Sequence, residues 1–508
     1  MPGPSLSSRA WLTGALLLAG CARSSLDLAP PSPSQPWVPA TSAIGEIVPG
    51  KASASAAPSP QGYVLPANPA LAVLPAPSID PHHAYTLAEL IDIAELNNPS
   101  TRIAWNEARN AALAAGIAKS TYLPRITTSA VGGYQTQDQR SNLAGIDGDR
   151  DADGVIAAVS LQWLLFDFGG REAAVAAARQ DSVISNIVFT AAHQKLIHDV
   201  SLAYYTHAAA RAHVAAAEQS LENAKAVQAS AEDRYRRGVG TVIEVNQTLQ
   251  VTAQARLALV TARSAAQNSG VTLLAAMGVS PLIPVQIAEP EHRQLSPAMA
   301  GEIEKIVTDA LARRPDMLAA YAAQKRSAAN VRAARSAFMP KIFVATTGSY
   351  ATGDIDVSAL PGTGGESPTF NLSSRRASAT ILAGVTIPLF DGGRRDALLR
   401  QARNNQEAAD SSFARTSQDA VREIVIANNQ LANSLAAVDA STALVAAAQT
   451  NYDAALDAYR SGVGPITPVL EAQTQLLAAK TASIDAYSQA LSSAATLALA
   501  TGSLGSAP

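Results

Sequence analysis

The hydrophobic and polar positions of this chain follow two periods, that of a strand and that of a helix. Between residues 155 and 163, apolar residues occupy every second position, with serine and glutamine between the last of them. The same alternation recurs between residues 379 and 387, with threonine and glycine in between. An apolar face opposite a polar or small one, over about ten residues, is typical of transmembrane barrel strands. Segments that begin at Ile126 and Ile342 are their predicted partners, so two strand hairpins are expected.

Most of the remaining sequence has a helical pattern. Helices are predicted over residues 99–121 and 315–337, because the proline at each start suits a first helical turn, where its missing N–H is not needed. Residues 171–237 contain no proline over 67 positions. A continuous helix of that length reaches about 100 Å, far more than a bilayer requires. Return helices are expected to end near Met277 and Ala500.

These elements occur twice, in the same order and with matching intervals. The matching motifs are Asn98-Pro99 and Arg314-Pro315, Leu123-Pro124 and Met339-Pro340, Phe166-Asp167-Phe168-Gly169-Gly170-Arg171 and Phe390-Asp391-Gly392-Gly393-Arg394, and Tyr235 to Gly240 and Tyr459 to Gly464. Only the interval from the second proline to the motif aspartate differs, 43 residues in the first half and 51 in the second. The length change is confined to one connection, so residues 135–154 and 351–374, rich in Gly, Asp, Asn and Ser, are predicted to be external loops.

Four predicted strands per chain cannot close a barrel, because even small barrels need about eight. Open strand edges cannot face lipid, so several copies are expected to share one barrel. The predicted fold is mainly α with a small β part: long α-helical hairpins form a periplasmic tunnel, and four strands per chain contribute to a shared transmembrane β-barrel. The predicted organisation is a signal peptide (1–20), a tether (21–83), a first repeat (84–290), a second repeat (291–502) and a C-terminal tail (503–508).

The N-terminus has the pattern of a lipoprotein export signal. Arg9 precedes an apolar run over residues 11–20 that is too short to cross a bilayer, and Leu18-Ala19-Gly20-Cys21 resembles a lipobox. Cys21, the only cysteine, is predicted to carry the lipid anchor; the alternative is an ordinary signal cleaved elsewhere. By resemblance to bacterial lipoproteins, Ala22 favours sorting to the outer membrane. Residues 22–80, rich in Pro, Ala and Ser, are predicted to form an extended tether.

The composition and the absence of known motifs exclude several classes of function. Charged residues are 16% of the 508 positions, below the roughly 25% of a typical soluble domain. A net charge of −3 gives no electrostatic case for nucleic acid. No nucleophile elbow, Walker loop or metal-spaced histidine pair occurs, so no enzyme activity and no cofactor are predicted. The histidines at 193, 198, 207 and 213 are interpreted as residues of a helix surface.

The chain resembles the TolC family of outer-membrane factors over roughly residues 84–502. The paired Asn/Arg-Pro to Leu/Met-Pro spans, Phe-Asp-(x)-Gly-Gly-Arg, and Tyr-x-x-Gly-Val-Gly followed by Val-Leu-Glu-Ala-Gln at 469–473 carry the resemblance. It implies a homotrimer in the cell outer membrane, with a twelve-stranded barrel continued by an α-helical tunnel into the periplasm. It also implies that cargo arrives from an inner-membrane pump or ABC exporter through a periplasmic adaptor (membrane fusion) protein.

The two glycine-rich turns between long helices are the main candidate site. Glycine just past a helix end fits a left-handed cap, and the resemblance implies that these tips meet the adaptor. Capping alone would not require valine between two glycines in both halves. The predicted adaptor-contacting residues are Gly238, Val239, Gly240 and Thr241, and Gly462, Val463, Gly464 and Pro465.

Acidic residues after the tips are candidates for a periplasmic gate. Related channels place acids on the inner helix after the second tip; Glu471 holds one such position, but Pro468 holds the other. Glu244 is the acid after the first tip. The alternative for Glu471 is an exposed carboxylate favoured near a helix N-terminus by the helix dipole.

The first external loop contains alternating carboxylates. Asp149, Asp151 and Asp153, followed by Gly154, resemble a calcium-binding loop, but Ser160 replaces the expected twelfth-position glutamate. A solvated acidic loop is the commoner explanation, so no resident metal is predicted.

The predicted function is that of a passive outer-membrane channel subunit in a tripartite efflux system for small molecules. Two alternatives stay open: the outer-membrane channel of a type I protein secretion system, and a lipid-anchored periplasmic coiled-coil scaffold without a pore. The scaffold leaves the alternating strands unexplained. The sequence does not give the cargo or the partner pump.

Overall fold

The computed structural model of the chain describes residues 79–140, 147–283, 285–289, 303–353 and 377–505, and short stretches before residue 79 (29, 32–33, 37, 39–51, 64–65 and 67–72). The chain divides into two compact units, Met1–Ser78 and Ile79–Pro508. In the first unit, β1 (Pro39–Thr41) and β2 (Ile47–Lys51) pair antiparallel, and η2 (Pro69–Ala72) is a 3-10 turn.

The first unit corrects the prediction of a purely extended tether. The turn between β1 and β2 is closed by two hydrogen bonds, from Ser42 N to Glu46 O (2.8 Å) and from Gly45 N to Ser42 O (3.0 Å). Gly45 has φ 86°, a conformation that only glycine adopts without strain. A local Ser-x-x-Gly turn therefore forms a short hairpin within a Pro-rich segment. Cys21 lies outside the described residues.

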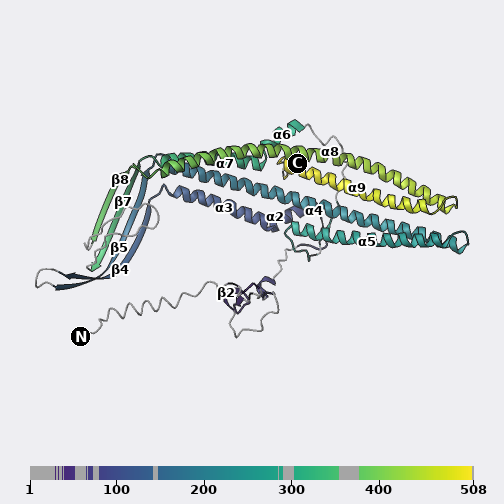
Figure 1. Cartoon of the computed structure of the whole chain (residues 1–508), viewed down its shortest axis with the longest axis horizontal. Coiled ribbons are helices and arrows are strands. Elements are labelled where there is room, and N and C mark those ends of the chain that lie inside the picture. Colours follow the sequence, from purple (N-terminus) through teal and green to yellow (C-terminus); the bar gives the residue numbers. More distant parts are fainter. Residues whose placement is uncertain are drawn as a thin grey trace. The chain divides into compact units, whose positions relative to one another are not determined.

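The second unit contains one antiparallel sheet with the strand order β4-β5-β7-β8 (Figure 1). Its strands are β4 (Arg125–Arg140), β5 (Asp147–Phe166), β7 (Lys341–Gly353) and β8 (Ala377–Thr386). The register places Val159 opposite Thr128 and Gly348, and Gly348 opposite Ala379. The alternating apolar residues of both halves therefore lie on the same face of the sheet.

The opposite face of the sheet carries hydroxyl groups. The hydroxyls of Thr127 and Ser160 lie 2.7 Å apart across β4 and β5, and those of Ser349 and Ser378 lie 2.7 Å apart across β7 and β8. Val159 on the first face is 53% exposed. An exposed apolar face and a hydroxyl-bearing face are what a strand needs between lipid and an aqueous lumen.

The first hairpin is longer than predicted. Residues 135–140 and 147–154 were expected in a loop, but their backbones pair in β4 and β5. The reason is that backbone pairing does not require apolar side chains. The backbones of Asp149, Asp151 and Asp153 are thus in β5, and their side chains lie outside what the structure describes, so the resemblance to a calcium loop stays a prediction.

Each half supplies a short, a medium, a very long and a returning helix. The first half has α2 (Leu87–Asn97), α3 (Pro99–Ser120), α4 (Gly170–Arg236) and α5 (Val242–Ala276). The second half has α6 (Ile303–Leu311), α7 (Pro315–Ser336), α8 (Arg394–Arg460) and α9 (Thr467–Ala500). The predicted long helices are confirmed, since α4 and α8 each have 67 residues. The short helices α2 and α6 were not predicted.

The medium and returning helices stack end to end. Asn98, at the start of α3, donates a hydrogen bond from its amide to the carbonyl of Ala276 at the end of α5 (2.8 Å). Arg314, at the start of α7, donates in the same way to the carbonyl of Ala500 at the end of α9 (2.7 Å). A Cβ on Gly278 would lie 2.7 Å from the Cα of Asn98, so the approach requires glycine. Two columns result, α3 with α5 and α7 with α9.

These two columns and the long helices α4 and α8 lie side by side in a helical wall (Figure 1). Helix α4 packs against α3, α5, α7 and α9, and α8 packs against α7 and α9. The wall therefore runs in the order α3/α5, α4, α7/α9, α8. Its two open edges continue the two open edges of the sheet, because α3 leads into β4 and β8 leads into α8.

The core is divided along the wall. The largest cluster lies where α2 packs on α4 and α5, with β3 (Ala84–Tyr85) and β6 (Gln286–Ile287) paired in parallel beside it. Its buried members include Leu90, Val200, Tyr204, Leu273 and Met277. Among the described residues, one helix, α8, is long and apolar enough to cross a membrane by length and composition, and most of that apolar window is not buried within the chain.

Candidate functional site: helical tips and strand–helix joints

The first tip is a glycine turn that ends α4. Gly238 has φ 76°, and the amides of Val239 and Gly240 both donate to the carbonyl of Arg234 (3.0 and 3.1 Å). A Cβ on Gly240 would stand 2.9 Å from the backbone N of Tyr235. The two glycines therefore have different tasks: the first provides the left-handed conformation, and the second allows the chain to return close to the helix.

The second tip repeats this geometry. Gly462 has φ 79°, and the amides of Val463 and Gly464 donate to the carbonyl of Ala458 (3.0 and 3.1 Å). A Cβ on Gly464 would lie 3.1 Å from the Cβ of Ala458. Capping thus accounts for all four glycines. It does not account for the valine between them.

The valines at the tips point into solvent. Val239 is 65% exposed and Val463 is 83% exposed, and Val242 and Ile243 beside the first tip are also exposed. Thr241 caps α5 by accepting a hydrogen bond from the amide of Glu244 (3.2 Å). The tips therefore present apolar side chains that no other part of the described chain covers.

Three residues connect the two tips, and we call Arg234, Glu244 and Tyr459 the tip clamp. Arg234 at the end of α4 donates to the carbonyls of Tyr459 and Val239 (both 3.4 Å), and its guanidinium lies 4.9 Å from the centre of the Tyr459 ring. The Tyr459 hydroxyl donates to Glu244 (3.4 Å). Tyr459 is only 1% exposed. Burial, and then the charge of Glu244, raise the pKa of Tyr459, so its hydroxyl stays protonated as the donor.

The tip clamp breaks the symmetry of the repeat. The repeat equivalent of Arg234 is Ala458, and Tyr235, the equivalent of Tyr459, is 50% exposed. Sequence reasoning missed Arg234 and Tyr459 as functional candidates. The signal was present as arginine at 234 against alanine at 458, in two motifs that otherwise differ only at Arg237 and Ser461.

The two predicted gate acids have different surroundings. Glu244 is half-buried and accepts the Tyr459 hydroxyl. Glu471 is exposed in the first turns of α9, next to the buried Ala472 and Gln473, and forms no ion pair with the part of the chain that the structure describes. Within one chain, Glu244 is hydrogen-bonded to the opposite helical hairpin, and Glu471 is not.

The first strand–helix joint is built on an aspartate and an arginine four residues apart. Asp167 accepts a hydrogen bond from the amide of Arg171 (2.7 Å), which caps the start of α4. The Arg171 guanidinium donates to the carbonyls of Leu164 and Leu165 and lies over the Tyr122 ring (4.9 Å). The arginine thus connects the end of β5 to the end of α3.

The second joint corrects the motif alignment. The Asp391 carboxylate binds the side chain of Arg395, and not that of Arg394: the Arg395 Nε lies 2.7 Å from the Asp391 carboxylate, and its Nη1 donates to the carbonyl of Pro388 (2.7 Å). Gly392, with φ 67°, takes the place of Phe168, with φ 52°. The motif has no insertion in the first half, because the aspartate-to-arginine spacing of four residues is fixed by the first helical turn.

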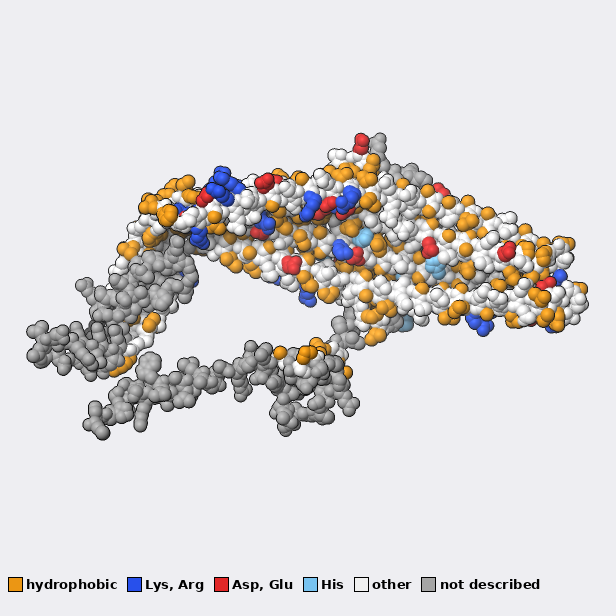
Figure 2. All heavy atoms as spheres, in the orientation of Figure 1, with side chains coloured by type: hydrophobic (Ala, Val, Ile, Leu, Met, Phe, Trp, Pro, Cys, Tyr) orange, Lys and Arg blue, Asp and Glu red, His pale blue; other side chains and the backbone are white. Residues whose placement is uncertain are grey.

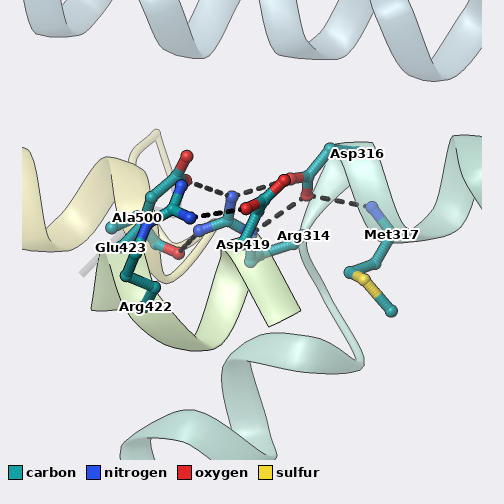
Figure 3. A network of polar contacts seen from close by, with 7 residues as sticks. All are labelled: Arg314, Asp316, Met317, Asp419, Arg422, Glu423 and Ala500. Carbon is teal, nitrogen blue, oxygen red and sulfur yellow. Dashed lines mark hydrogen bonds and ion pairs between the residues drawn. The ribbon is translucent and has the colours of Figure 1, made fainter. Parts of the chain in front are cut away.

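A buried arginine holds the junction between α9 and α7 (Figure 3). Arg314 is 7% exposed, donates twice to Asp316 (3.0 and 2.7 Å) and once to Glu423 on α8 (2.7 Å). Burial alone raises the pKa of Asp316, but the hydrogen bonds from Arg314 outweigh it and lower the pKa below its ordinary value. The equivalent position in the first half is Asn98, so the charge network is particular to the second half.

Removing this arginine is expected to destabilise the helical wall. Arg314→Met leaves the Ala500 carbonyl and two carboxylates without their donor, a loss of about 2 kcal/mol in the free energy of unfolding, given the partial exposure of both acids. Acid should remove the Asp316 contribution as pH falls below about 4, because the folded-state pKa lies below the unfolded one. Denaturant unfolding measures both effects. Arg422→Met, which breaks an exposed pair with Asp419, is the control and should cost under about 1 kcal/mol.

The four histidines of α4 were predicted to be residues of a helix surface. Each of them instead lies where α4 contacts another helix. Their partners are Glu95 for His193 (3.3 Å), Thr496 for His198 (3.2 Å), Ser269 for His207 (3.0 Å) and Asp485 for His213 (2.8 Å). Burial and then the charge of Arg211 lower the pKa of His207. Among the described residues no cluster of His, Cys, Asp and Glu could hold a metal ion.

Comparison with known proteins decides the family. The family model described as "Outer membrane efflux protein" matches residues 90–279 and 306–503, which include both tips, both joints and both medium helices. The chain belongs to this family. The predicted resemblance to TolC-type outer-membrane factors is thereby confirmed, as are the helical-tunnel fold with strands contributed to a barrel and the location in the outer membrane with an extension into the periplasm.

Individual relatives agree with the family over most of the chain. Protein CyaE of Bordetella pertussis is 28% identical over 449 residues, covering 88% of this chain and 90% of CyaE. Outer membrane protein OprJ of Pseudomonas aeruginosa is 29% identical over 416 residues, covering 79% and 81%. The crystal structure of outer membrane protein VceC from Vibrio cholerae has the same fold, with a TM-score of 0.69, 23% identity and coverage of 82% of this chain and 96% of VceC.

Proposed function

We propose that this chain is one of three identical subunits of a passive outer-membrane duct in a tripartite efflux system. The observation that carries the proposal is that the open edges of the sheet and of the helical wall belong to connected elements. Strand β4 and the α3/α5 column form one edge, and strand β8 and helix α8 form the other. An edge strand with unpaired N–H and C=O groups cannot stay open in lipid. Pairing the β8 edge of one copy with the β4 edge of the next is a head-to-tail contact that closes into a ring, and three copies supply twelve strands.

The helical edges carry apolar side chains that a neighbouring copy would cover. They include Ile103, Leu113 and Ile117 on α3, Leu257 and Val260 on α5, and Ile426 and Leu444 on α8, all more than half exposed in the single chain. The apolar window of α8 that is long enough for a bilayer lies on this edge. Subunit contact accounts for its exposure without placing α8 in the membrane.

Disulfide cross-linking tests the ring. Cysteine at Ala130 of β4, combined in turn with cysteine at Ala379, Ile381 or Ala383 of β8, is expected to yield covalent trimers on oxidation, because these positions share one face of the sheet at its two edges. Non-reducing gel electrophoresis reads the result. The control pair at Val159 and Gly348, directly opposite within one chain, should give only an internal bond. Monomers throughout the β8 series would refute the ring.

The tips are the proposed docking site for a periplasmic adaptor protein, which links the duct to an inner-membrane pump. The exposed Val239 and Val463 support this role, because capping needs only the glycines. Cys21 is the proposed lipid attachment. We propose that the cargo is a small molecule and that the chain catalyses no step, because export through a duct needs none. If the chain restored secretion of a large protein by an ABC exporter, and no small-molecule efflux, type I secretion would be favoured instead.

The proposed gate has two parts, the acids Glu471 and Glu244. Three copies would bring three exposed Glu471 carboxylates around one axis, where like charges attract cations and repel anions. Glu471→Gln is therefore expected to lower the cation selectivity of the channel in planar bilayers, measured as reversal potential in a salt gradient. Glu222→Gln, an exposed carboxylate paired with Lys225 on α4, is the control. An unchanged reversal potential would mean that Glu471 does not act in a gate and is only favoured near the start of α9 by the helix dipole.

A further inference from the structure

A pocket of about 340 Å³ lies at the first joint, between the start of α4 and the end of α7. One wall comes from the joint and the first turns of α4, and the other from the last turns of α7. The lining residues used below are Phe168 and Glu172 on the first wall, and Arg332, Arg335, Ser336 and Met339 on the second.

The charge of this pocket is positive. Arg332 and Arg335 lie about one turn apart on α7 and are exposed. Neither side chain forms an ion pair or hydrogen bond within the part of the chain that the structure describes, whereas Arg171 and Arg395 nearby are engaged by the joints. Glu172 is the acid that lines the pocket, so two cationic groups face one anionic group.

The fold itself does not require the two arginines. Helices α3 and α7 are repeat equivalents of 22 residues each, and both lead into a strand through a proline. Gly116 stands in α3 where Arg332 stands in α7, and Lys119 stands where Arg335 stands. A Cβ on Gly116 would meet nothing within 4 Å, so α3 folds in the same way without a long basic side chain at the position of Arg332.

The pocket lies at the level where strands give way to helices. β5 ends at Phe166 and β7 begins at Lys341, directly beside the pocket residues. Large apolar side chains are exposed at this level, namely Leu123, Phe166, Phe168, Phe338, Met339, Leu389 and Phe390. Figure 2 shows Lys and Arg side chains among hydrophobic ones at the end of the helices that meets the strands. Exposed phenylalanine and leucine beside lysine and arginine are typical of segments that lie at the headgroup boundary of a membrane.

We propose that this pocket binds the phosphodiester headgroup of an anionic glycerophospholipid in the periplasmic leaflet of the outer membrane. The guanidinium groups of Arg332 and Arg335 hold the phosphate by charge-assisted hydrogen bonds. Phe168 and Met339, each nearly half exposed, contact the first part of an acyl chain. Glu172 accepts a hydrogen bond from a glycerol headgroup hydroxyl. The inference rests on the location in the outer membrane, and not on the cargo, the gate or the adaptor.

The test counts lipid retained by the purified full-length protein. Protein in detergent is mixed with phosphatidylglycerol or phosphatidylcholine, and native mass spectrometry measures the lipids bound per subunit. We expect preferential retention of phosphatidylglycerol, reduced at least tenfold in the double variant Arg332→Gln/Arg335→Gln and largely restored in Arg332→Lys/Arg335→Lys, which keeps the charge. Arg400→Gln, which removes an exposed arginine paired with Asp396 near the start of α8, is the matched control and should retain the lipid.

Several outcomes would overturn the proposal. Equal retention of phosphatidylcholine, or of phosphatidylethanolamine, would remove the preference for an anionic lipid. Displacement of the lipid by millimolar inorganic phosphate would identify a free-phosphate site instead. Unchanged retention in the double glutamine variant would show that the arginines are not the ligands. Thermal unfolding, subunit number and conductance should be the same in all variants, so a failure here leaves the channel function untouched.

Discussion

Replacing Val239 and Val463 by aspartate is expected to abolish export while leaving the assembled channel intact. Both valines are exposed at the tips, 65% and 83%, and the backbone that carries them is fixed by glycines whose conformation does not depend on the valine side chain. Burying a valine on a partner contributes roughly 1.5–3 kcal/mol, and an unpaired charge there costs several more. The loss corresponds to at least about a hundredfold weaker adaptor binding.

Two measurements separate docking from folding in this variant. Export is measured as drug accumulation in cells whose own channel is deleted and whose adaptor and pump work with the unmodified chain. Assembly is measured as subunit number in detergent. Val239→Ile with Val463→Ile keeps the tips apolar and should export normally. Normal export by the double aspartate variant would show that the adaptor does not contact the tips through these residues.

Much of the fold could be predicted because long helices and barrel strands are set by local pattern. The end of α3 at Ser120 and the 67-residue lengths of α4 and α8 follow from prolines and glycines at their ends. The apolar faces of β5 and β8 follow from a period of two, and the observed register brings both to one side of the sheet. The internal repeat strengthened each prediction, because a pattern seen once could be accidental.

The features that were missed depend on partners distant in sequence or on the backbone alone. Residues 135–140 and 147–154 are mostly polar or glycine and yet paired, since strand pairing needs no apolar side chain. Arg394 was aligned with Arg171, whose structural equivalent is Arg395, because the motifs were matched by composition and not by the four-residue spacing that a helix start imposes. Short helix α2 is stabilised by a capping box between Thr86 and Glu89 that the helical pattern alone did not reveal.

The tip clamp is the part of the site that could not be predicted from local pattern, because the difference between Arg234 and Ala458 does not identify the partner of the arginine. Arg234 and Tyr459 are 225 residues apart, and their contact exists only because the α4–α5 and α8–α9 hairpins end at the same level. Equivalent tyrosines differ in exposure, 50% for Tyr235 against 1% for Tyr459, so the two halves differ in packing at their tips while keeping the same backbone. The asymmetry indicates that one hairpin is restrained by the other.

Releasing that restraint is expected to increase conductance. Tyr459→Phe removes the hydroxyl that donates to Glu244, and Arg234→Gln removes the cation over the Tyr459 ring together with its bonds to two tip carbonyls. Because these bonds are long (3.4 Å), each contributes about 0.5–1.5 kcal/mol, which shifts the ratio of held to released hairpins by about two- to tenfold. Single-channel recordings in planar bilayers should show larger or longer openings, greatest in the double variant.

The repeat provides the control for this prediction. Tyr235→Phe makes the same chemical change at the equivalent position of the first tip, where the ring is half exposed and does not contact the other hairpin through the clamp. Its conductance should equal that of the unmodified channel. Conductance equal to that of the unmodified channel in Tyr459→Phe, Arg234→Gln and their double variant would mean that the clamp positions the tips without restraining them. The exposed Glu471 residues of the proposed three copies would then be the remaining candidates for closing the channel.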